Sequence, residues 1–354
     1  MVDQWFLKVL LFPLAVLYGL GVAIRNGLYS AGLLKGVSFN IPVISIGNLS
    51  VGGTGKTPHT EYLIRLLREH LKLAVLSRGY RRQTSGYLEV MPQHDALQSG
   101  DEPLQYKRKY PDIQVVVAES RGLAIPLLLR SYPDIQVVIL DDGFQHREVT
   151  PGLNVLLTEY NQLYTRDWLL PVGRLREWRD SADHADMIIV TKCPEKISSE
   201  EMLALQKEVR RNDRQQIFFS KFFYGLPYRM YGAPERFRLS ADIDVLLVVA
   251  IAGTEYLLEY VESACGEVKM MEYQDHHSFS NFDIGNIELH FKTMDSGRQK
   301  IILTTEKDAV RLDVYRELLQ SLSLPLYILP VAVQFENGQI FDHAIREWLL
   351  NFKL

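Results

Sequence analysis

Cysteine is scarce in this sequence. Among its 354 residues are two cysteines, Cys193 and Cys265, which lie far apart and belong to no CxxC or Cys/His cluster. A disulfide framework or a zinc site is built from several such residues at short spacings, so we expect neither in this protein. A composition with so little cysteine fits a reducing, cytoplasmic compartment.

A surplus of basic residues is also missing. Lys and Arg together number 39 and Asp and Glu number 43, which gives a formal net charge of -4. General nucleic-acid binders carry a basic excess because they neutralise phosphates, so we expect no nucleic-acid partner.

The sequence likewise has no low-complexity tract and no long Pro/Ser-rich linker. A chain of 354 residues is nevertheless longer than one hydrophobic core comfortably holds. We therefore expect two domains that follow each other without a long disordered connection.

One long apolar stretch, Trp5–Ile24, stands near the N-terminus and carries a single charge, Lys8. Its length is sufficient to cross a bilayer of roughly 30 Å. Pro13, Gly19 and Gly21 weaken it as a straight spanning helix, and a small-residue cleavage site of the signal-peptide kind is lacking. Three alternatives stay open: a helix that spans or lies on a membrane, a buried core helix, or a signal peptide.

The most informative stretch is Gly47–Pro58, which reads GNLSVGGTGKTP. It follows an apolar run, Ile41–Ile46, that predicts a strand, and it precedes Glu61–Leu71, whose leucines have helical spacing. Strand, glycine-rich turn, Gly-Lys-Thr and helix form the arrangement of a phosphate-binding loop. One position departs from the general pattern, because Ser50 stands where the first glycine is usual.

The physics of such a loop is direct. Glycines let backbone amides point at a phosphate, and the following helix turns its unpaired N–H groups toward the same anion. Lys56 would add a positive charge near the β- and γ-phosphates, and the Thr57 hydroxyl would bind Mg²⁺. The predicted nucleotide-binding residues are Ser50, Val51, Gly52, Gly53, Thr54, Gly55, Lys56 and Thr57.

Beyond this loop, apolar runs alternate with helical patterns. The runs are Leu73–Leu76, Ile113–Ala118, Ile135–Leu140, Asn154–Leu157 and Met187–Thr191. Continuous Val/Ile/Leu runs are typical of parallel strands buried on both faces, so we predict a parallel sheet with right-handed crossovers.

A second α/β pattern follows an aromatic-rich segment at 216–231. Its predicted strands are Val245–Ile251, Val268–Tyr273 and Lys300–Thr304. The expected fold is α/β: a P-loop NTPase-type parallel sheet domain, a smaller α/β domain joined by a two-stranded β hinge, and an N-terminal hydrophobic helix. The predicted divisions are residues 1–30 for the helix, 31–215 for the P-loop domain and 216–354 for the second domain, with hinge strands near 216–224 and 326–333.

Two adjacent acids, Asp141 and Asp142, end the strand Ile135–Leu140. A carboxylate at the end of a strand beside a P-loop is where such enzymes hold Mg²⁺. Many strands also end in acidic turns without any ligand, but the P-loop favours the metal role. Shortly after them, His146 can contact a phosphate, hold a carboxylate or cap the loop.

Further acids, Asp101 and Glu102, begin a predicted helix. They suit the helix dipole, and they also suit a base that deprotonates an attacking hydroxyl. Asp275 and His276 precede His277 in the second half. Vicinal histidines suggest metal binding, an Asp–His pair can tune proton transfer, and a loop histidine can also have no role.

Three arginines follow apolar or turn segments and can bind phosphates through two parallel hydrogen bonds. They are Arg78, Arg121 and Arg176, each of which, taken singly, is more typical of a surface arginine.

Together these motifs resemble the tetraacyldisaccharide 4'-kinase family of lipid A biosynthesis. The matching segments are SIGNLSVGGTGKTP (Ser45–Pro58), LSRGY (Leu76–Tyr80), GDEP (Gly100–Pro103), LDDGFQHR (Leu140–Arg147), GRLRE (Gly173–Glu177), VTK (Val190–Lys192), DHH (Asp275–His277) and TEKDAVR (Thr305–Arg311). They run in order over most of the chain, and Ser50 is usual in this family.

The resemblance implies an activity. ATP donates its γ-phosphate to the 4'-hydroxyl of a tetraacylated glucosamine disaccharide 1-phosphate, which gives the bisphosphorylated lipid A precursor lipid IVA. Two α/β/α domains joined by a two-stranded hinge enclose the site. The N-terminal helix would associate with the cytoplasmic face of the bacterial inner membrane, peripherally or as a single anchor, because the acceptor is a lipid. No obligate protein partner is implied.

The resemblance also implies roles for individual residues. Asp101 would be the base, His276 would pair with it, and Asp275 would orient His276. Thr57, Asp141 and Asp142 would serve Mg²⁺, with Glu102 assisting. The residues implied to lie near phosphates or substrate are Arg78, Arg121, His146 and Arg176. This chain has GRLRE where the family pattern has GPLRE, so Arg174 competes with Arg176 for that role.

Other functions compete with this one. A nucleotide switch or metallochaperone-type GTPase would carry N/T-K-x-D after a strand, whereas Thr191-Lys192 is followed here by Cys193-Pro194. Adenine is therefore favoured over guanine. An ATP-dependent ligase would not need the hydrophobic N-terminus, and a structural protein with a degenerate nucleotide site would not need an intact Gly-Lys-Thr.

Overall fold

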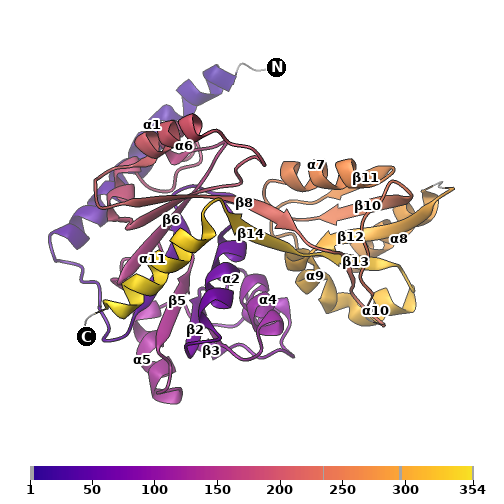
Figure 1. Ribbon diagram of the computed structural model, residues 1–354, viewed down its shortest axis with the longest axis horizontal. Coiled ribbons are helices and arrows are strands. Elements are labelled where there is room, and N and C mark those ends of the chain that lie inside the picture. Colours follow the sequence, from indigo (N-terminus) through magenta and orange to yellow (C-terminus); the bar gives the residue numbers. More distant parts are fainter. Residues whose placement is uncertain (1–3, 234, 295–296, 353–354) are drawn as a thin grey trace.

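A computed structural model describes residues 4–233, 235–294 and 297–352 of the chain, so residues 1–3 of the predicted N-terminal segment lie outside the described residues. It contains two α/β units joined by strands β8 (Gln216–Tyr224) and β14 (Val331–Phe335), with helix α1 (Gln4–Ser30) along one side of the larger unit (Figure 1). The predicted fold class is confirmed.

The larger unit is built on a mixed nine-stranded sheet. Its strands are β1 (Val43–Asn48), β2 (Leu73–Ser77), β3 (Leu88–Glu89), β4 (Gln114–Val117), β5 (Val137–Asp141), β6 (Leu153–Glu159), β7 (Met187–Thr191), β8 (Gln216–Tyr224) and β14 (Val331–Phe335), and its helices are α2 (Lys56–Leu67), α3 (Ala96–Ser99), α4 (Asp101–Lys109), α5 (Arg121–Ser131), η1 (Tyr164–Arg166), η2 (Arg179–His184), α6 (Ser199–Val209) and α11 (Gly338–Leu350).

The strand order places the P-loop strand near the middle of this sheet. The order is β14-β8-β7-β6-β1-β5-β2-β4-β3, with antiparallel pairing only for the edge strands β14 and β3. β1 pairs in parallel with β5 on one side and β6 on the other. The carboxyl ends of β1, β5 and β2 therefore meet at one edge.

The smaller unit is a five-stranded sheet with helices around it. Its elements are β9 (Tyr228–Arg229), β10 (Ile243–Val249), α7 (Glu255–Ala264), β11 (Val268–Glu272), α8 (Asn281–Thr293), β12 (Gln299–Thr305), α9 (Glu306–Leu312), η3 (Asp313–Tyr315), α10 (Arg316–Ser321) and β13 (Leu326–Leu329). The order is β11-β10-β12-β13-β9, and only β9 is antiparallel to its neighbour.

The two-stranded connection differs in one respect from the prediction. Residues 326–329 form β13 and pair with β12 inside the small sheet, whereas Val331–Phe335 forms β14 and pairs antiparallel with β8. A single predicted strand, 326–333, is thus two strands divided at Pro330, which cannot donate a ladder hydrogen bond. The ribbon exists, and its action as a hinge stays a prediction.

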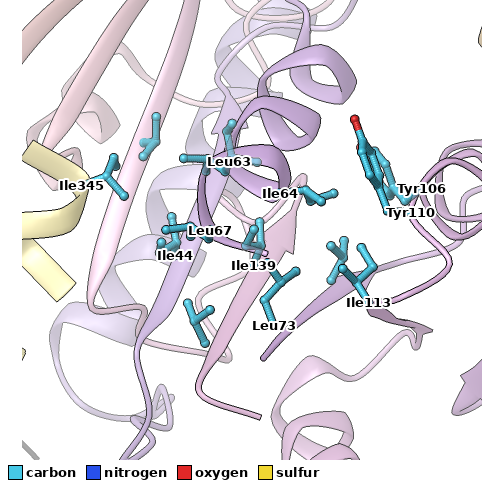
Figure 2. Close-up of a cluster of buried hydrophobic side chains, with 14 of the residues drawn as sticks. Ile44, Leu63, Ile64, Leu67, Leu73, Tyr106, Tyr110, Ile113, Ile139 and Ile345 are labelled. Carbon is cyan, nitrogen blue, oxygen red and sulfur yellow. The ribbon is translucent and has the colours of Figure 1, made fainter. Parts of the chain in front are cut away.

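The C-terminal helix also lies elsewhere than the predicted division 216–354 implies. Phe341 and Ile345 of α11 are buried in the same cluster as Ile44 and Leu63 of the larger unit, as Figure 2 shows for Ile345. The chain therefore crosses to the smaller unit on β8 and returns on β14. The amphipathic sequence of this segment does not say which core the apolar face of the helix meets.

The N-terminal apolar stretch forms α1 (Gln4–Ser30), with Pro13 inside it. The segment Lys8–Ser30 has the length and hydropathy to cross a membrane, and 11% of its apolar window is buried, which argues against a core helix. It docks through polar contacts: the indole Nε1 of Trp178 donates to the Gly19 carbonyl at 2.8 Å, and Arg25 donates to the Gln145 carbonyl at 2.8 Å.

Candidate active site

A cavity of about 680 Å³ lies between the two units, where the carboxyl ends of both parallel sheets face each other. Open α/β sheets bind ligands at this edge because loops and helix N-termini gather there. The larger unit contributes the P-loop after β1 and Asp141 at the end of β5. The smaller unit contributes Ala252 after β10, His276 after β11 and Lys307 after β12.

The P-loop adopts a conformation that needs its glycines. Gly52 and Gly55 have φ angles of 112° and 87°, which side chains rarely tolerate. Gly55 caps α2 without any side-chain hydrogen bond, so the first amides of the helix have no such partner. The Nζ atom of Lys56 lies 3.3 Å from Asn48 Oδ1 and 3.5 Å from Asp142 Oδ1. The backbone thus forms an anion cradle with a lysine at its rim.

Asp141 and Asp142 occupy different environments. Asp141 is buried, accepts from Ser77 Oγ at 3.2 Å, and has its pKa raised by burial and by Asp142. Asp142 has a φ of 50° that turns it toward Lys56 and Arg176. Burial acts to raise the pKa of Asp142, but the two cations hold it below its usual value. Two carboxylates therefore stand beside the cradle, one of them held as an anion.

Arg121 is the most enclosed of the predicted phosphate ligands. It begins α5, is 1% exposed, and donates through Nη2 to the Asp141 carbonyl at 2.8 Å. Its Nε and Nη1 atoms donate to no acceptor among the described residues, although both are buried. Burial lowers its pKa. An unpaired buried guanidinium is costly without an anion, so this side chain fits a phosphate group.

Three other predicted phosphate ligands, Arg78, His146 and Arg176, line the same cavity. Burial and the charges of Arg121 and Arg78 lower the pKa of His146 to about 3. Its imidazole is therefore neutral at physiological pH and can offer one N–H donor.

The structure separates Arg176 from Arg174, which the sequence left as competitors. Arg174 donates through Nε to the Val51 carbonyl at 3.2 Å, and its guanidinium lies against Gly52. It braces the outside of the P-loop. Arg176 lines the cavity and lies 3.6 Å from an Asp142 oxygen.

Asp101 stands at the N-terminus of α4 and is 5% exposed. Its Oδ2 atom accepts from Arg311 Nε at 2.7 Å and lies 3.2 Å from His276 Nδ1. Burial alone would raise its pKa, but Lys307, His276 and Arg311 together hold the pKa well below its usual value. The carboxylate is thus anionic, and its cationic partners come from the smaller unit.

His276 is held in a left-handed backbone conformation with φ of 59°. Lys307 Nζ lies 3.4 Å from its Nε2, and Nδ1 lies 3.2 Å from Asp101 Oδ2 and 3.1 Å from Arg311 Nη2. A proton on Nδ1 suits the contacts with Asp101 and Lys307, whereas the contact with Arg311 requires Nδ1 to accept. The nearest Asp275 oxygen is 3.8 Å from Nε2, which is longer than a hydrogen bond. Lys307 takes the contact that the sequence argument assigned to Asp275, whose orienting role stays a prediction.

Glu102 pairs with Lys307, with 2.7 Å between Oε1 and Nζ. Burial and the adjacent Asp101 raise the pKa of Glu102 to about 8, and Lys307 opposes them. Ligand atoms of Asp101, Glu102 and His276 lie within 4.8 Å of one another, but the Lys307 ammonium already occupies a position 2.7 Å from the Glu102 carboxyl. A magnesium role for Glu102 is not tested by this arrangement.

Two site residues, Lys307 and Arg311, were missed as individual predictions. Both belong to TEKDAVR, where Thr305 accepts from the Asp308 amide and caps α9 at the end of β12. A signal was present: basic residues follow a buried strand at helical spacing. Their partners are about 200 positions away in sequence, so only the folded chain brings them to Asp101.

Comparison with known proteins identifies the relatives of this chain. Residues 7–350 match the family model described as LpxK, tetraacyldisaccharide-1-P 4'-kinase. The chain belongs to this family. The resemblance drawn from the motifs is confirmed, and so is the prediction that the protein is a kinase.

Several LpxK proteins match over nearly their whole length. The tetraacyldisaccharide 4'-kinase of Bacteroides thetaiotaomicron is 42% identical over 350 residues, covering 95% of this chain and 92% of that protein. The one from Flavobacterium johnsoniae is 42% identical over 347 residues, covering 97% of each. The crystal structure of Aquifex aeolicus LpxK in complex with ATP has a TM-score of 0.72 at 28% identity, covering 97% of this chain and 99% of that one.

Proposed function

We propose that this protein transfers the γ-phosphate of ATP to the 4'-hydroxyl of a tetraacyldisaccharide 1-phosphate. The observation that carries the proposal is one cavity lined by the P-loop of the larger unit and by His276 of the smaller unit, whose Nδ1 lies 3.2 Å from the buried Asp101. Phosphoryl transfer asks a protein for positioning and charge neutralisation more than for covalent chemistry.

The nucleotide would occupy the larger unit's wall. The amides of residues 50–57 would bind the phosphates, with Lys56 at the transferred group and Arg121 supplying its unpaired donors. Arg78, His146 and Arg176 line the same wall and would contact the nucleotide or the acceptor's own phosphate. The ATP complex of the Aquifex aeolicus relative supports this choice of nucleotide.

The donor set beside the P-loop also fits Mg²⁺. A hydroxyl from Thr57 and carboxylates from Asp141 and Asp142 are the hard oxygen ligands that this ion prefers. When bound, the ion would neutralise charge on the β- and γ-phosphates. In our proposal these three residues hold it, and Glu102 joins them only if Lys307 moves away from its carboxylate.

The acceptor hydroxyl would meet Asp101. Its Oδ2 atom is engaged by Arg311 and His276, whereas Oδ1 accepts the Glu102 amide at 3.0 Å and keeps a lone pair for a hydroxyl proton. A depressed pKa keeps this carboxylate deprotonated at neutral pH, so it is free to accept a proton, but the same cations make it a weaker base. The partner His276 would hold the same carboxylate through Oδ2, which leaves Oδ1 for the hydroxyl proton.

A lipid acceptor would approach along α1. The large apolar side chains of α1 are exposed, among them Leu10, Leu17 and Ile24. The same helix touches segments that line the cavity, because Tyr18 donates to the Arg176 carbonyl at 2.8 Å. We propose that α1 lies on or in the inner membrane at its cytoplasmic face, so that acyl chains stay in lipid while the sugar enters the cavity.

The decisive experiment is transfer of label from γ-labelled ATP to a tetraacyldisaccharide 1-phosphate in detergent. We expect a labelled bisphosphorylated lipid with the wild-type protein, and a loss of several orders of magnitude with Lys56→Ala, because the charge at the transferred phosphate is removed. ATP hydrolysis without labelled lipid would contradict the proposed acceptor while leaving nucleotide binding in place.

A further inference from the structure

Arg311 connects the smaller unit to the proposed base, Asp101, by direct hydrogen bonds. Its Nε and Nη2 atoms both donate to Asp101 Oδ2, the former at 2.7 Å. Arg311 is 7% exposed and Asp101 is 5% exposed, so the pair is shielded from water. A charge-assisted contact of this kind fixes both groups strongly.

The other edge of the same guanidinium is anchored as firmly. Nη1 donates to Asp308 Oδ1 at 2.8 Å and to the Ala250 carbonyl at 2.7 Å. Asp308 is fully buried and its Oδ2 accepts from Thr305 Oγ1 at 2.8 Å and from the Ala250 amide at 3.1 Å. The planar guanidinium therefore has one orientation, set by the ends of β10 and β12.

The residue Ala250 also orients the second partner of Asp101. Its carbonyl accepts from the His276 amide at 3.2 Å as well as from Arg311. One backbone group of the smaller unit thus fixes both side chains that hold the Asp101 carboxylate. Any displacement of this frame moves Arg311 and His276 together relative to α4.

We propose that Arg311 is a positioning residue that fixes the Asp101 carboxylate so that Oδ1 faces the acceptor hydroxyl. The inference rests on the proposed function, because it assumes that Asp101 acts as the base. Arg311 touches neither substrate in this scheme. It aligns the base only when the smaller unit lies against α4, so base alignment depends on the relative placement of the two units.

A structural alternative is that Arg311 merely attaches the two units. The chain offers a matched control for this, because Arg108 of α4 pairs with Asp313 at 2.8 Å across the same interface. Arg108 is absent from the cavity wall and contacts no proposed catalytic group. Arg108→Gln removes an ion pair between the units without touching Asp101.

The test measures kcat and the KM for ATP in the labelled-lipid assay for Arg311→Gln, Arg311→Lys, Arg108→Gln, Asp101→Asn and the double variant Asp101→Asn with Arg311→Gln. We expect Arg311→Gln to lower kcat about 100-fold with the KM for ATP changed less than about 2-fold. Arg311→Lys keeps the charge but not the planar fork, so kcat falls about 10-fold. Arg108→Gln changes kcat by less than about 3-fold.

The double variant separates positioning from attachment. If Arg311 acts through Asp101, adding Arg311→Gln to Asp101→Asn lowers kcat by less than about 3-fold further. A further 100-fold loss, or equal losses for Arg311→Gln and Arg108→Gln, would overturn the inference. Arg311→Lys with full wild-type kcat would do the same, and it covers the case in which Arg311→Gln does not fold. Failure of the proposed function is distinct, because the wild-type protein would then form no labelled lipid.

Discussion

The two sheets present the same kind of edge to the cavity but use it differently. The larger sheet offers a cradle made of consecutive residues, in which glycine conformations and helix amides would supply the binding groups. The smaller sheet offers single side chains from two strand ends, His276 after β11 and both Lys307 and Arg311 on α9 after β12. Ion pairs join Lys307 and Arg311 to acids of the other unit, and His276 Nδ1 lies 3.2 Å from Asp101.

This difference separates the P-loop, whose shape is set by neighbouring residues, from the proposed base, whose orientation needs the complete fold. The cradle is shaped by its own backbone, so it exists wherever the two units lie. The proposed base, by contrast, takes its orientation and its depressed pKa from cations of the other unit. Substitutions that remove the base, alter the connection or disturb the contact between the units should therefore have effects of different size and kind.

Removing the base has the largest expected effect in this comparison. We predict that Asp101→Ala lowers kcat about 1,000-fold while the dissociation constant for ATP changes little, because the cradle remains intact. The measurements are single-turnover transfer of labelled phosphate and nucleotide binding by the same protein.

Asp112→Ala is the matched control, since this carboxylate of the same unit pairs with Arg68 on the exposed surface. We expect near-normal turnover from it. Thermal unfolding must accompany both variants, because Asp101→Ala leaves the buried Arg311 paired with Asp308 but without its Asp101 partner. Near-normal turnover of Asp101→Ala would rule out the base assignment.

The sequence was sufficient where binding groups follow one another along the chain. The stretch 47–58 predicted the P-loop, its strand and its helix, because glycine requirements and helix signals are local. Continuous apolar runs likewise predicted the parallel sheets, since strands buried on both faces must be apolar throughout.

The sequence was insufficient where partners are distant. No residue near Asp101 in the sequence predicts its contact with Arg311, which lies about 200 residues away. The sequence pattern of α11 likewise does not indicate that this helix packs on the larger sheet. Pro330 is a local signal for the break between β13 and β14, and it could have corrected the single strand predicted for 326–333. Long-range pairing depends on tertiary geometry, which local periodicity does not encode.

The buried His59 connects the cradle to the ribbon. Its Nδ1 lies 2.7 Å from the Gly55 carbonyl and so carries the proton, and its Nε2 accepts from Ser220 Oγ of β8 at 2.9 Å. Burial lowers its pKa to about 4, while the Gly55 contact opposes that shift. Protonation would reverse the bond to Ser220, because Nε2 would then donate and the hydroxyl oxygen would accept.

This depressed pKa predicts a pH-dependent stability. Below pH 6.5 the unfolded chain protonates His59 and the folded protein resists until about pH 4, so up to ~3 kcal/mol of stability is present above pH 6.5 and is lost as the pH falls toward 4. The His59→Gln variant lacks this term. In urea unfolding, its deficit relative to wild type should shrink by about 2–3 kcal/mol between pH 7.5 and 4.5.

His343→Gln on α11 serves as the control for that measurement, because it removes an exposed histidine. A deficit of His59→Gln that is equal at both pH values would show that the imidazole is not held neutral. The link between cradle and ribbon would then rest on packing alone.

The contact between the two edges is tested by the smallest change. A Cβ atom built on Gly53 of the P-loop would lie 2.3 Å from the backbone oxygen of Ala252 in the smaller unit, and a backbone atom cannot yield as a flexible side chain does. Gly53→Ala should therefore hold the units apart and lower kcat about 10-fold, while the cradle amides keep the dissociation constant for ATP within about 3-fold.

Gly285→Ala in α8 is the control, because its Cβ would meet nothing within 4 Å. If Gly53→Ala instead weakened ATP binding and left kcat unchanged, the P-loop would depend on the smaller unit for nucleotide binding. The proposed difference between a nucleotide site shaped by its own backbone and a base that needs both units would then be wrong.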